Sequence, residues 1–442
     1  MEVISLIGIV IALVFINYSM YRGLGLPLAC VIGTMVIWLS GGTGFQAGWA
    51  DCMNATAPTL GRMLPIFMFG AILGFLYTNS GAATSLGLAC FRPFKNVKNH
   101  DIKMLGTIFM FFVLRFILAL SGIDNMALIV TVVALATVLF QDLDLPRKYC
   151  NAFLMVAGTI PTFMPGAPTM LNVILPMFLP GFTATSCFVP RMLFLLIFIV
   201  VATIWLYALC KKDKKNGAHF VPAHGMNTGD VNDPNVKRPF WVLTLIPLLL
   251  VYILCTVVGW EAWLGLFCGC IAASILFIPY IKAPEGTKKF GWLVGQFNRS
   301  AVQIPLYYTM SYFPAYAMLA APGWTLLTAW MSSLANSLPL ALGFGIVSTV
   351  LVPVGSSALV INAEIANTIF VPAGLAAGTA GTLLIVANTV FDSLPNSPGM
   401  IMQAELTETS MRECYPSIFK TTVLLTGGIM VLATVLAMIG IL

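Results

Sequence analysis

The sequence predicts an all-α polytopic membrane protein composed of two inverted-topology repeats. The first reason is composition, because 59% of the 442 residues are hydrophobic and 9% are charged, whereas a soluble chain carries about a quarter charged residues. The second is that many apolar runs approach the roughly 20 residues that cross a bilayer as a helix. The third is a broken apolar segment that occurs once in each half of the chain and indicates the repeat.

The broken segment reads AGTIPTFMPGAPTM at 157–170 and recurs as ANTVFDSLPNSPGM at 387–400. Proline lacks the backbone N–H and clashes with the preceding turn, so neither copy is expected to form one continuous helix. Interrupted helices at corresponding positions of two halves are the best sequence indication of a transporter's binding site. The matching prolines are Pro165 and Pro168 in the first copy and Pro395 and Pro398 in the second.

The N-terminal repeat begins with spans that include a Gly-rich polar stretch at 41–61, which we expect to be a loop. A hairpin follows, and its tip at 121–125 (SGIDN) separates two apolar arms. This hairpin either spans the membrane twice or is re-entrant. The elements predicted for residues 1–210 are scaffold spans at 1–90, a hairpin at 104–141, a broken helix at 149–183 and a span at 189–210.

The one long hydrophilic stretch, 211–238, is predicted to be a linker in the cytoplasm that divides the chain nearly in half. The C-terminal repeat, 239–442, shows the same order of elements, with a helix-poor stretch expected at 322–339. An odd number of crossings before the linker gives the second repeat the opposite orientation. Its predicted elements are a hairpin at 340–373, a broken helix at 376–405 and a last span at 418–442.

Basic loops set the expected orientation. Loop 91–103 contains Arg92, Lys95, Lys98 and Lys103, and lysine and arginine favour the cytoplasmic side of a membrane. This loop and the linker are therefore placed inside, and both termini are placed outside. The net charge of +6 lies in such loops, so it is interpreted as this bias and not as a surface for nucleic acid.

Three segments resemble GntP-type gluconate permeases. They are Gly70–Ala83 (GAILGFLYTNSGAA), Met164–Asn172 (MPGAPTMLN) and Phe391–Asn396 (FDSLPN). The chain departs from the family where Asn396 and Ser397 stand in place of His-Asn. The resemblance implies an elevator-type secondary transporter of the bacterial cytoplasmic (inner) membrane, which moves a small organic (hydroxy)carboxylate by symport with H+ or Na+ and forms a homodimer.

Small polar residues at the breaks and hairpin tips are the candidates for binding the anion. Helices that restart after a break present free N–H groups and a positive dipole end, which suit a carboxylate. The alternative for each residue is a helix cap or a contact between helices. The candidates are Asn125, Thr162, Thr169, Asn172, Ser356, Ser357, Ser393, Asn396 and Ser397.

Asp392 and Asp124 are the candidates for ion coupling. A charged group inside a membrane is costly and marks a functional site by default. Asp392 lies at the second break, and Asp124 lies at the tip of the first hairpin, where it either holds a cation or caps the second arm. The three histidines lie in predicted loops, so a carboxylate would carry a coupled proton; Na+ near Asp124 and Asp392 is the alternative.

Other function classes find less support. The chain contains no HExxH, GxSxG or phosphate-binding loop, and its ten cysteines form no CxxC pair. We therefore expect no enzyme activity, no catalytic residue, no cofactor and no structural metal, and the expected partners are the organic anion and the lipid bilayer. A channel, an intramembrane enzyme and an ion/H+ antiporter are the alternatives.

Overall fold

The computed structural model describes residues 1–22, 24–123, 125–221, 231, 236–351, 357–391, 393 and 398–442. Over these residues the regular secondary structure is helical and includes no strand; a helix satisfies its backbone hydrogen bonds internally, as lipid requires. The prediction of an all-α polytopic membrane protein is confirmed at this level. In the described part of the chain, six helices are long and apolar enough to cross a membrane, at Glu2–Met20, Leu60–Asn79, His100–Ala119, Phe188–Lys215, Ala262–Tyr280 and Met411–Met438.

The first scaffold helices differ from the prediction at residues 41–61. The prediction of a loop there is wrong, because α3 begins at Phe45 and continues for 35 residues through Pro58 and Pro65. Tertiary contacts favour the helix over the low propensity of its glycines: the Trp49 ring lies 5.2 Å from the ring of Phe313. The helices are α1 (Glu2–Tyr21), α2 (Leu26–Gly41), α3 (Phe45–Asn79) and α4 (Ala82–Phe91), followed by the 3-10 turn η1 (Arg92–Phe94).

The rest of the first half contains the hairpin and the first interrupted helix. Residues 164–169 between α7 and α8 are not helical. Residues Lys211 to Lys215, expected in the linker, belong to α9, where Lys211 pairs with Asp101 at 2.6 Å. The elements are α5 (His100–Ala119), α6 (Asn125–Asp142), η2 (Arg147–Tyr149), α7 (Cys150–Phe163), α8 (Met170–Phe178) and α9 (Phe188–Lys215).

The second half begins with α10 (Trp241–Tyr252), η3 (Ile253–Val257), α11 (Ala262–Phe277), η4 (Ile278–Tyr280), α12 (Lys289–Ser311), α13 (Phe313–Ala320) and α14 (Trp324–Ser337). The helix-poor stretch expected at 322–339 is wrong, because Pro322 and Pro339 lie just outside α14 and bound it without interrupting it. The remaining elements are α15 (Leu340–Leu351), α16 (Ser357–Ile365), η6 (Ala366–Phe370), α17 (Ala377–Phe391), α18 (Pro398–Leu406), α19 (Met411–Ile418), η7 (Phe419–Leu424) and α20 (Leu425–Met438).

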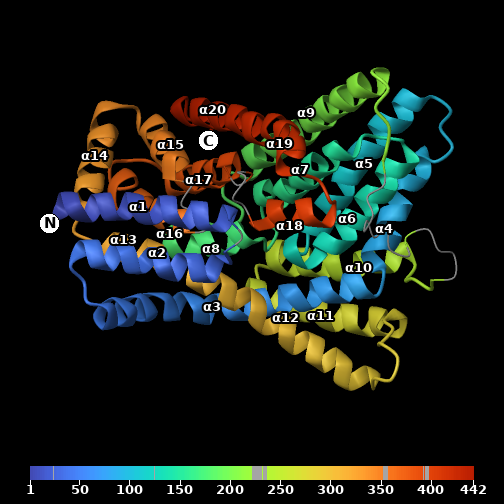
Figure 1. Cartoon of the computed structure of the whole chain (residues 1–442), viewed down its shortest axis with the longest axis horizontal. Helices are drawn as coiled ribbons and strands as arrows, with labels where there is room; N and C mark the ends of the chain where they lie inside the picture. The colour runs from blue at the N-terminus through green and yellow to red at the C-terminus, as the bar shows by residue number, and fades with distance from the viewer. Residues whose placement is uncertain are drawn as a thin grey trace.

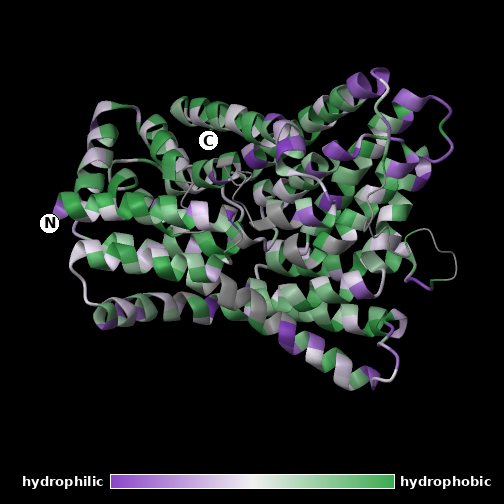
Figure 2. Ribbon diagram, viewed as in Figure 1, coloured by the Kyte–Doolittle hydropathy of each residue, from purple (hydrophilic) through white to green (hydrophobic). Residues whose placement is uncertain are grey.

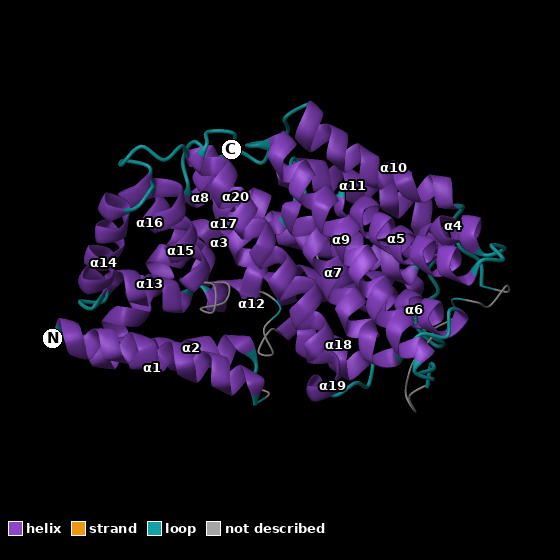
Figure 3. Ribbon diagram, turned by 90° about the horizontal axis from the view of Figure 1, so that it is seen from above, coloured by secondary structure: helices purple, strands orange, loops and turns teal. Residues whose placement is uncertain are grey.

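The two halves contact one another in a reciprocal pattern. Helix α3 packs along α11 and α12, and α12 packs along α2 and α3. Similarly, α4 packs on α10, and α14 packs on α1. Within the halves, α5, α7 and α9 pack on one another, as do α15, α17 and α20. Figures 1 and 3 show α7, α8, α17 and α18 near the middle of the long axis of the molecule.

Hydrophilic residues gather at one end of the molecule. Figure 2 shows them around the α4–α5 connection, the end of α9 and the α11–α12 connection, at the end of the long axis away from the N-terminus. The helices between the ends are mostly hydrophobic in the same view. The basic loops identified in the sequence therefore lie together on one side of the apolar bundle.

Candidate functional site

The first break, residues 164–169, has its backbone groups paired by distant parts of the chain. Gly166 adopts a φ of +79°, a conformation that glycine reaches without steric cost. Its N–H donates to the carbonyl of Ala184 over 2.9 Å, and its carbonyl accepts from the hydroxyl of Thr256 over 2.8 Å. Non-helical backbone at membrane depth requires such partners, so these contacts hold the interruption open.

Asn172 and Arg191 form further hydrogen bonds to backbone carbonyls of the break. The Nδ2 of Asn172 donates to the carbonyls of Met164 over 2.6 Å and Ala167 over 2.8 Å. The guanidinium of Arg191 donates to the Oδ1 of Asn172 over 2.6 Å, to the Met164 carbonyl over 3.3 Å and to the Ala184 carbonyl over 2.9 Å. Both side chains are buried. A side chain from the start of α9 is thus bound against the first turn of α8.

The tip of the first hairpin lies directly on this break. Gly122 has a φ of +66°, and a Cβ built on it would lie 2.1 Å from the carbonyl oxygen of Pro168. Only a residue without a side chain permits this approach. The residues that the sequence analysis assigned to a hairpin tip and to a broken helix are therefore brought together.

The interrupted helices of the two halves also pack against each other's hairpins. The restart helix α8 packs on α16, the second arm of the second hairpin, and α18 packs on α6, the second arm of the first. Helices α7 and α17 are in contact as well. The region between the two breaks is therefore built from both halves of the chain.

The structure places four of the predicted binding residues in this region. Thr162 is half-buried near the end of α7. Thr169 is the N-cap of α8 and Asn172 lies in its first turn. Ser393 is buried at the second break, and its hydroxyl has no hydrogen-bond partner among the described residues.

The other predicted site residues are described in part or not at all. Asn125 and Ser357 are the first residues of α6 and α16. The candidates outside the described residues are Asp124, Ser356, Asp392, Asn396 and Ser397. The predicted Na+ site near Asp124 and Asp392 therefore also lies outside them. Elsewhere, in the part of the chain that the structure describes, no group of three or more His, Cys, Asp or Glu residues is placed to hold a metal ion.

Two site residues were missed by the sequence analysis. Arg191 is the only charged residue between Lys148 and Lys211, and that isolation in an apolar stretch was the available signal. Asn151, the second residue of α7, bonds to the hydroxyls of Thr407 and Thr409 after α18. Nothing in the local sequence of Asn151 indicates this contact, because its partners lie more than half the chain away.

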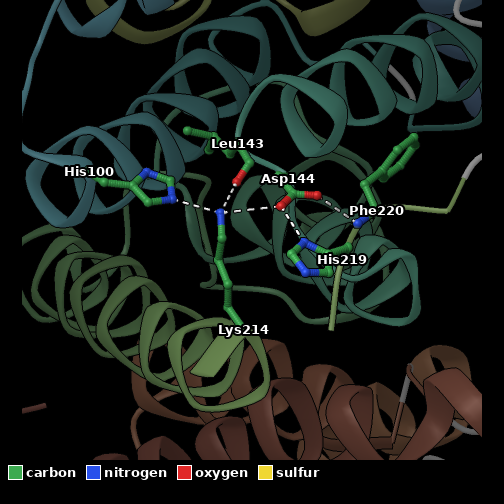
Figure 4. Close-up of polar contacts among 6 residues, drawn as sticks. All are labelled: His100, Leu143, Asp144, Lys214, His219 and Phe220. Carbon is green, nitrogen blue, oxygen red and sulfur yellow. Dashed lines mark hydrogen bonds and ion pairs between the residues drawn. The ribbon is translucent and has the colours of Figure 1, made fainter. Parts of the chain in front are cut away.

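A separate polar cluster lies around Asp144, between α6 and η2 (Figure 4). The Asp144 carboxylate accepts from the backbone N–H of Phe220 over 2.9 Å and lies 2.7 Å from the Nδ1 of His219. The Phe220 N–H, followed by His219, lowers the pKa of Asp144 below its usual value, because both favour the charged carboxylate. The chain just after α9 is thereby attached to the base of the first hairpin.

Lys214 extends the same cluster toward the first arm of the hairpin. Its Nζ donates to the carbonyl of Leu143 over 2.9 Å and lies 2.7 Å from the Nε2 of His100 and 3.7 Å from the Asp144 carboxylate. Nearby, Asp213 pairs with Lys148. The end of α9 is thus bound to the start of α5 and the end of α6. Because its contacts join the ends of helices to one another, this cluster is interpreted as a structural clamp.

Comparison with known proteins adds no family assignment to this geometry. No protein-family model matches the chain, and a search of curated proteins gives no significant match.

Proposed function

We propose that the chain is a secondary active transporter that moves a small organic (hydroxy)carboxylate anion across a bacterial cytoplasmic membrane, driven by symport of H+ or Na+. One observation carries the proposal: the interrupted helix of each half restarts against the hairpin of the other half, α8 on α16 and α18 on α6. Interrupted helices at the interface of two repeats form the binding sites of many transporters. Movement of the breaks and hairpins relative to the scaffold helices exposes such a site to one face of the membrane at a time.

The reciprocal contacts of α3 with α11 and of α12 with α2 support an inverted-topology repeat. In such a repeat each element of one half takes the place of its counterpart in the other. We place the hydrophilic end of the molecule in the cytoplasm and both termini outside, following the positive-inside rule. The elevator motion and the homodimer rest on the resemblance to GntP-type permeases.

The carboxylate is the substrate group that suits this site, because restarting helices offer unpaired N–H groups and a positive dipole end. Coupling to the ion is assigned to Asp392, with Asp124 as the second candidate. Protonation or a bound Na+ neutralises an intramembrane carboxylate and removes the cost of moving its charge. The proposal includes no catalytic residue and no cofactor.

Uptake by proteoliposomes tests the function. The purified protein is reconstituted, and the entry of labelled gluconate, lactate and succinate is followed under imposed pH or sodium gradients. A carrier accumulates its substrate above the external concentration, saturates, and stops when the gradient is removed. Passive ohmic current would indicate a channel. Exchange of ions without an organic anion would indicate an antiporter, and chemical change of the compound would indicate an enzyme. Each of these results would contradict the proposal.

A further inference from the structure

Arg191 is a fully buried cation without a carboxylate partner among the described residues. Its exposed fraction is 0%, and none of the ion pairs found there includes it. Burying a charge is costly unless an opposite charge or strong hydrogen bonds compensate it. The bonds of Arg191 to two carbonyls and to Asn172 stabilise the guanidinium, but all three acceptors are neutral.

The position of Arg191 increases the uncompensated positive potential. The guanidinium contacts Asn172, which lies in the first turn of α8. The start of a helix carries a partial positive charge and N–H groups without intrahelical partners. A cation beside this helix start is unfavourable by itself and becomes favourable when an anion binds to both positive groups.

Two buried polar atoms beside the first turn of α8 have no hydrogen-bond partner among the described residues. They are the Nε of Arg191 and the hydroxyl of Thr169, whose side chain is 5% exposed. Thr169 is the N-cap of α8, yet its side chain forms no capping hydrogen bond. Buried polar atoms in native proteins are almost always paired. A structural role for Arg191 explains its three existing bonds, but it does not explain these two unused groups.

We infer that Arg191, Thr169 and the first N–H groups of α8 form a subsite that binds one carboxylate group of the transported anion. The Arg191 Nε–H, the Thr169 hydroxyl and the helix N–H groups are all donors, as a carboxylate requires. The inference rests on the proposed function for the identity of the ligand. Beyond that function, the inference states that the N-terminal half of the chain binds the anionic group and that Arg191 compensates its charge.

Thermal unfolding of the purified full-length protein is the first test. The probes are gluconate, lactate and succinate at constant ionic strength, with sorbitol as a polyol that lacks a carboxylate and with inorganic phosphate as another oxyanion. A ligand of the native state raises the melting temperature by mass action. We expect at least one carboxylate to do so more strongly than phosphate, which the same donors can also bind, and we expect sorbitol to have no effect. A phosphate shift as large as the best carboxylate shift, or no shift with any carboxylate, would contradict the subsite.

Thr169→Val tests the hydroxyl with little risk to the fold. Valine has nearly the same shape, and the replaced hydroxyl has no partner among the described residues to lose. The ligand-free melting temperature is expected to equal or exceed that of the wild type, while the dissociation constant for the carboxylate rises about tenfold or more, as for a lost hydrogen bond to a charged group. Unchanged affinity would exclude Thr169 from the subsite.

Asn172→Asp and Asn172→Ala form a matched pair for the charge of Arg191. Both variants lose the donor bonds to Met164 and Ala167, but the aspartate keeps an acceptor for Arg191 and supplies a negative charge. Because that charge compensates Arg191 internally, Asn172→Asp is expected to bind the carboxylate more weakly than Asn172→Ala. A purely structural role for Arg191 predicts the opposite order, since the aspartate preserves more of the native contacts.

Uptake measurements on the same variants separate the subsite from the proposed function. Carboxylate binding that Thr169→Val and Asn172→Asp weaken, without uptake by the wild type, would support the subsite and contradict the transporter. Uptake by the wild type together with unchanged binding by both variants would support the transporter and contradict the subsite.

Discussion

The hydroxyl of Thr407 donates a hydrogen bond to the Oδ1 of Asn151 over 2.8 Å, and the Nδ2 of Asn151 donates to the hydroxyl of Thr409 over 2.6 Å. All three side chains are buried. Asn151 lies in the first turn of α7, and the two threonines follow α18. This contact therefore joins the start of one interrupted helix to the end of the other, across the two halves of the chain.

Asn151→Ala is expected to lower the free energy of unfolding in detergent by about 1–3 kcal/mol, because it removes buried hydrogen bonds between the halves. Asn79→Ala is the control, since the amide of Asn79 bonds to the carbonyl of Phe75, one turn earlier in the same helix, and is exposed. Its effect is expected to stay within about 0.5 kcal/mol. Equal effects of the two variants, measured by thermal or denaturant unfolding, would show that the Asn151 contact does not stabilise the assembled halves.

Gly122→Ala is expected to displace the first hairpin tip from the break. A Cβ at residue 122 would lie 2.1 Å from the Pro168 carbonyl oxygen, and the φ of +66° is itself unfavourable for alanine. We expect loss of transport and a lower melting temperature. Gly70→Ala is the control, because its Cβ would lie 4.0 Å from the Gly122 carbonyl oxygen, an ordinary contact, and alanine favours the helix there. Normal uptake by Gly122→Ala would mean that contact between tip and break is not required.

The loop between α8 and α9 packs on the start of α17, and two glycines test that contact. A Cβ at Gly381 would lie 2.2 Å from the Phe182 ring, whereas one at Gly378 would lie 3.6 Å from the Cβ of Ser186. Overpacking of a buried ring costs about 1–3 kcal/mol, so Gly381→Ala is expected to lower the melting temperature. Gly378→Ala should be neutral or stabilising. The reverse order would contradict the packing of this loop on α17.

Asp392→Asn is expected to abolish accumulation of the substrate against a gradient. The amide mimics the neutral carboxylate, so the variant no longer depends on a coupled ion to neutralise the site. Exchange of internal for external substrate should persist, because exchange does not require the empty carrier to return. Uptake and counterflow in proteoliposomes, at several pH values and sodium concentrations, distinguish accumulation from exchange. If accumulation by the variant depends on pH and sodium as it does in the wild type, Asp392 is not the coupling residue and Asp124 is the next candidate.

Asp144→Asn should reduce stability at neutral pH but not in acid. The folded protein lowers the pKa of Asp144, so its carboxylate contributes stability above the pKa of the unfolded chain, and this contribution is lost as the pH falls through the lower folded value. Asparagine tolerates the φ of 54° at this position. The difference in melting temperature between wild type and variant should therefore shrink on acidification.

Asp142→Asn provides the control for that pH series. Asp142 is exposed at the end of α6 and forms no ion pair with another described residue. Its replacement should leave the melting temperature nearly unchanged at every pH. A constant difference for Asp144→Asn across the series would mean that its carboxylate charge does not support the clamp at the end of α9.

Local backbone chemistry explains how far the sequence could predict this protein. The composition determined the membrane class, and Pro165 and Pro168 determined that no continuous helix crosses 164–169, because a missing N–H and a ring clash act within one turn. The same local reasoning failed for 41–61 and 322–339. There, glycines and flanking prolines indicated loops, but helices α3 and α14 form.

Only the tertiary structure decided which side chains contact the breaks and pair their backbone groups. Arg191 reaches the first break from α9, Gly122 reaches it from the hairpin, and Asn151 finds its partners after α18. These contacts depend on how distant helices pack, which no periodicity or motif near each residue encodes. A helix interruption is a property of a few adjacent residues, whereas the partners that satisfy its backbone and its charge are supplied by long-range packing in a medium without water.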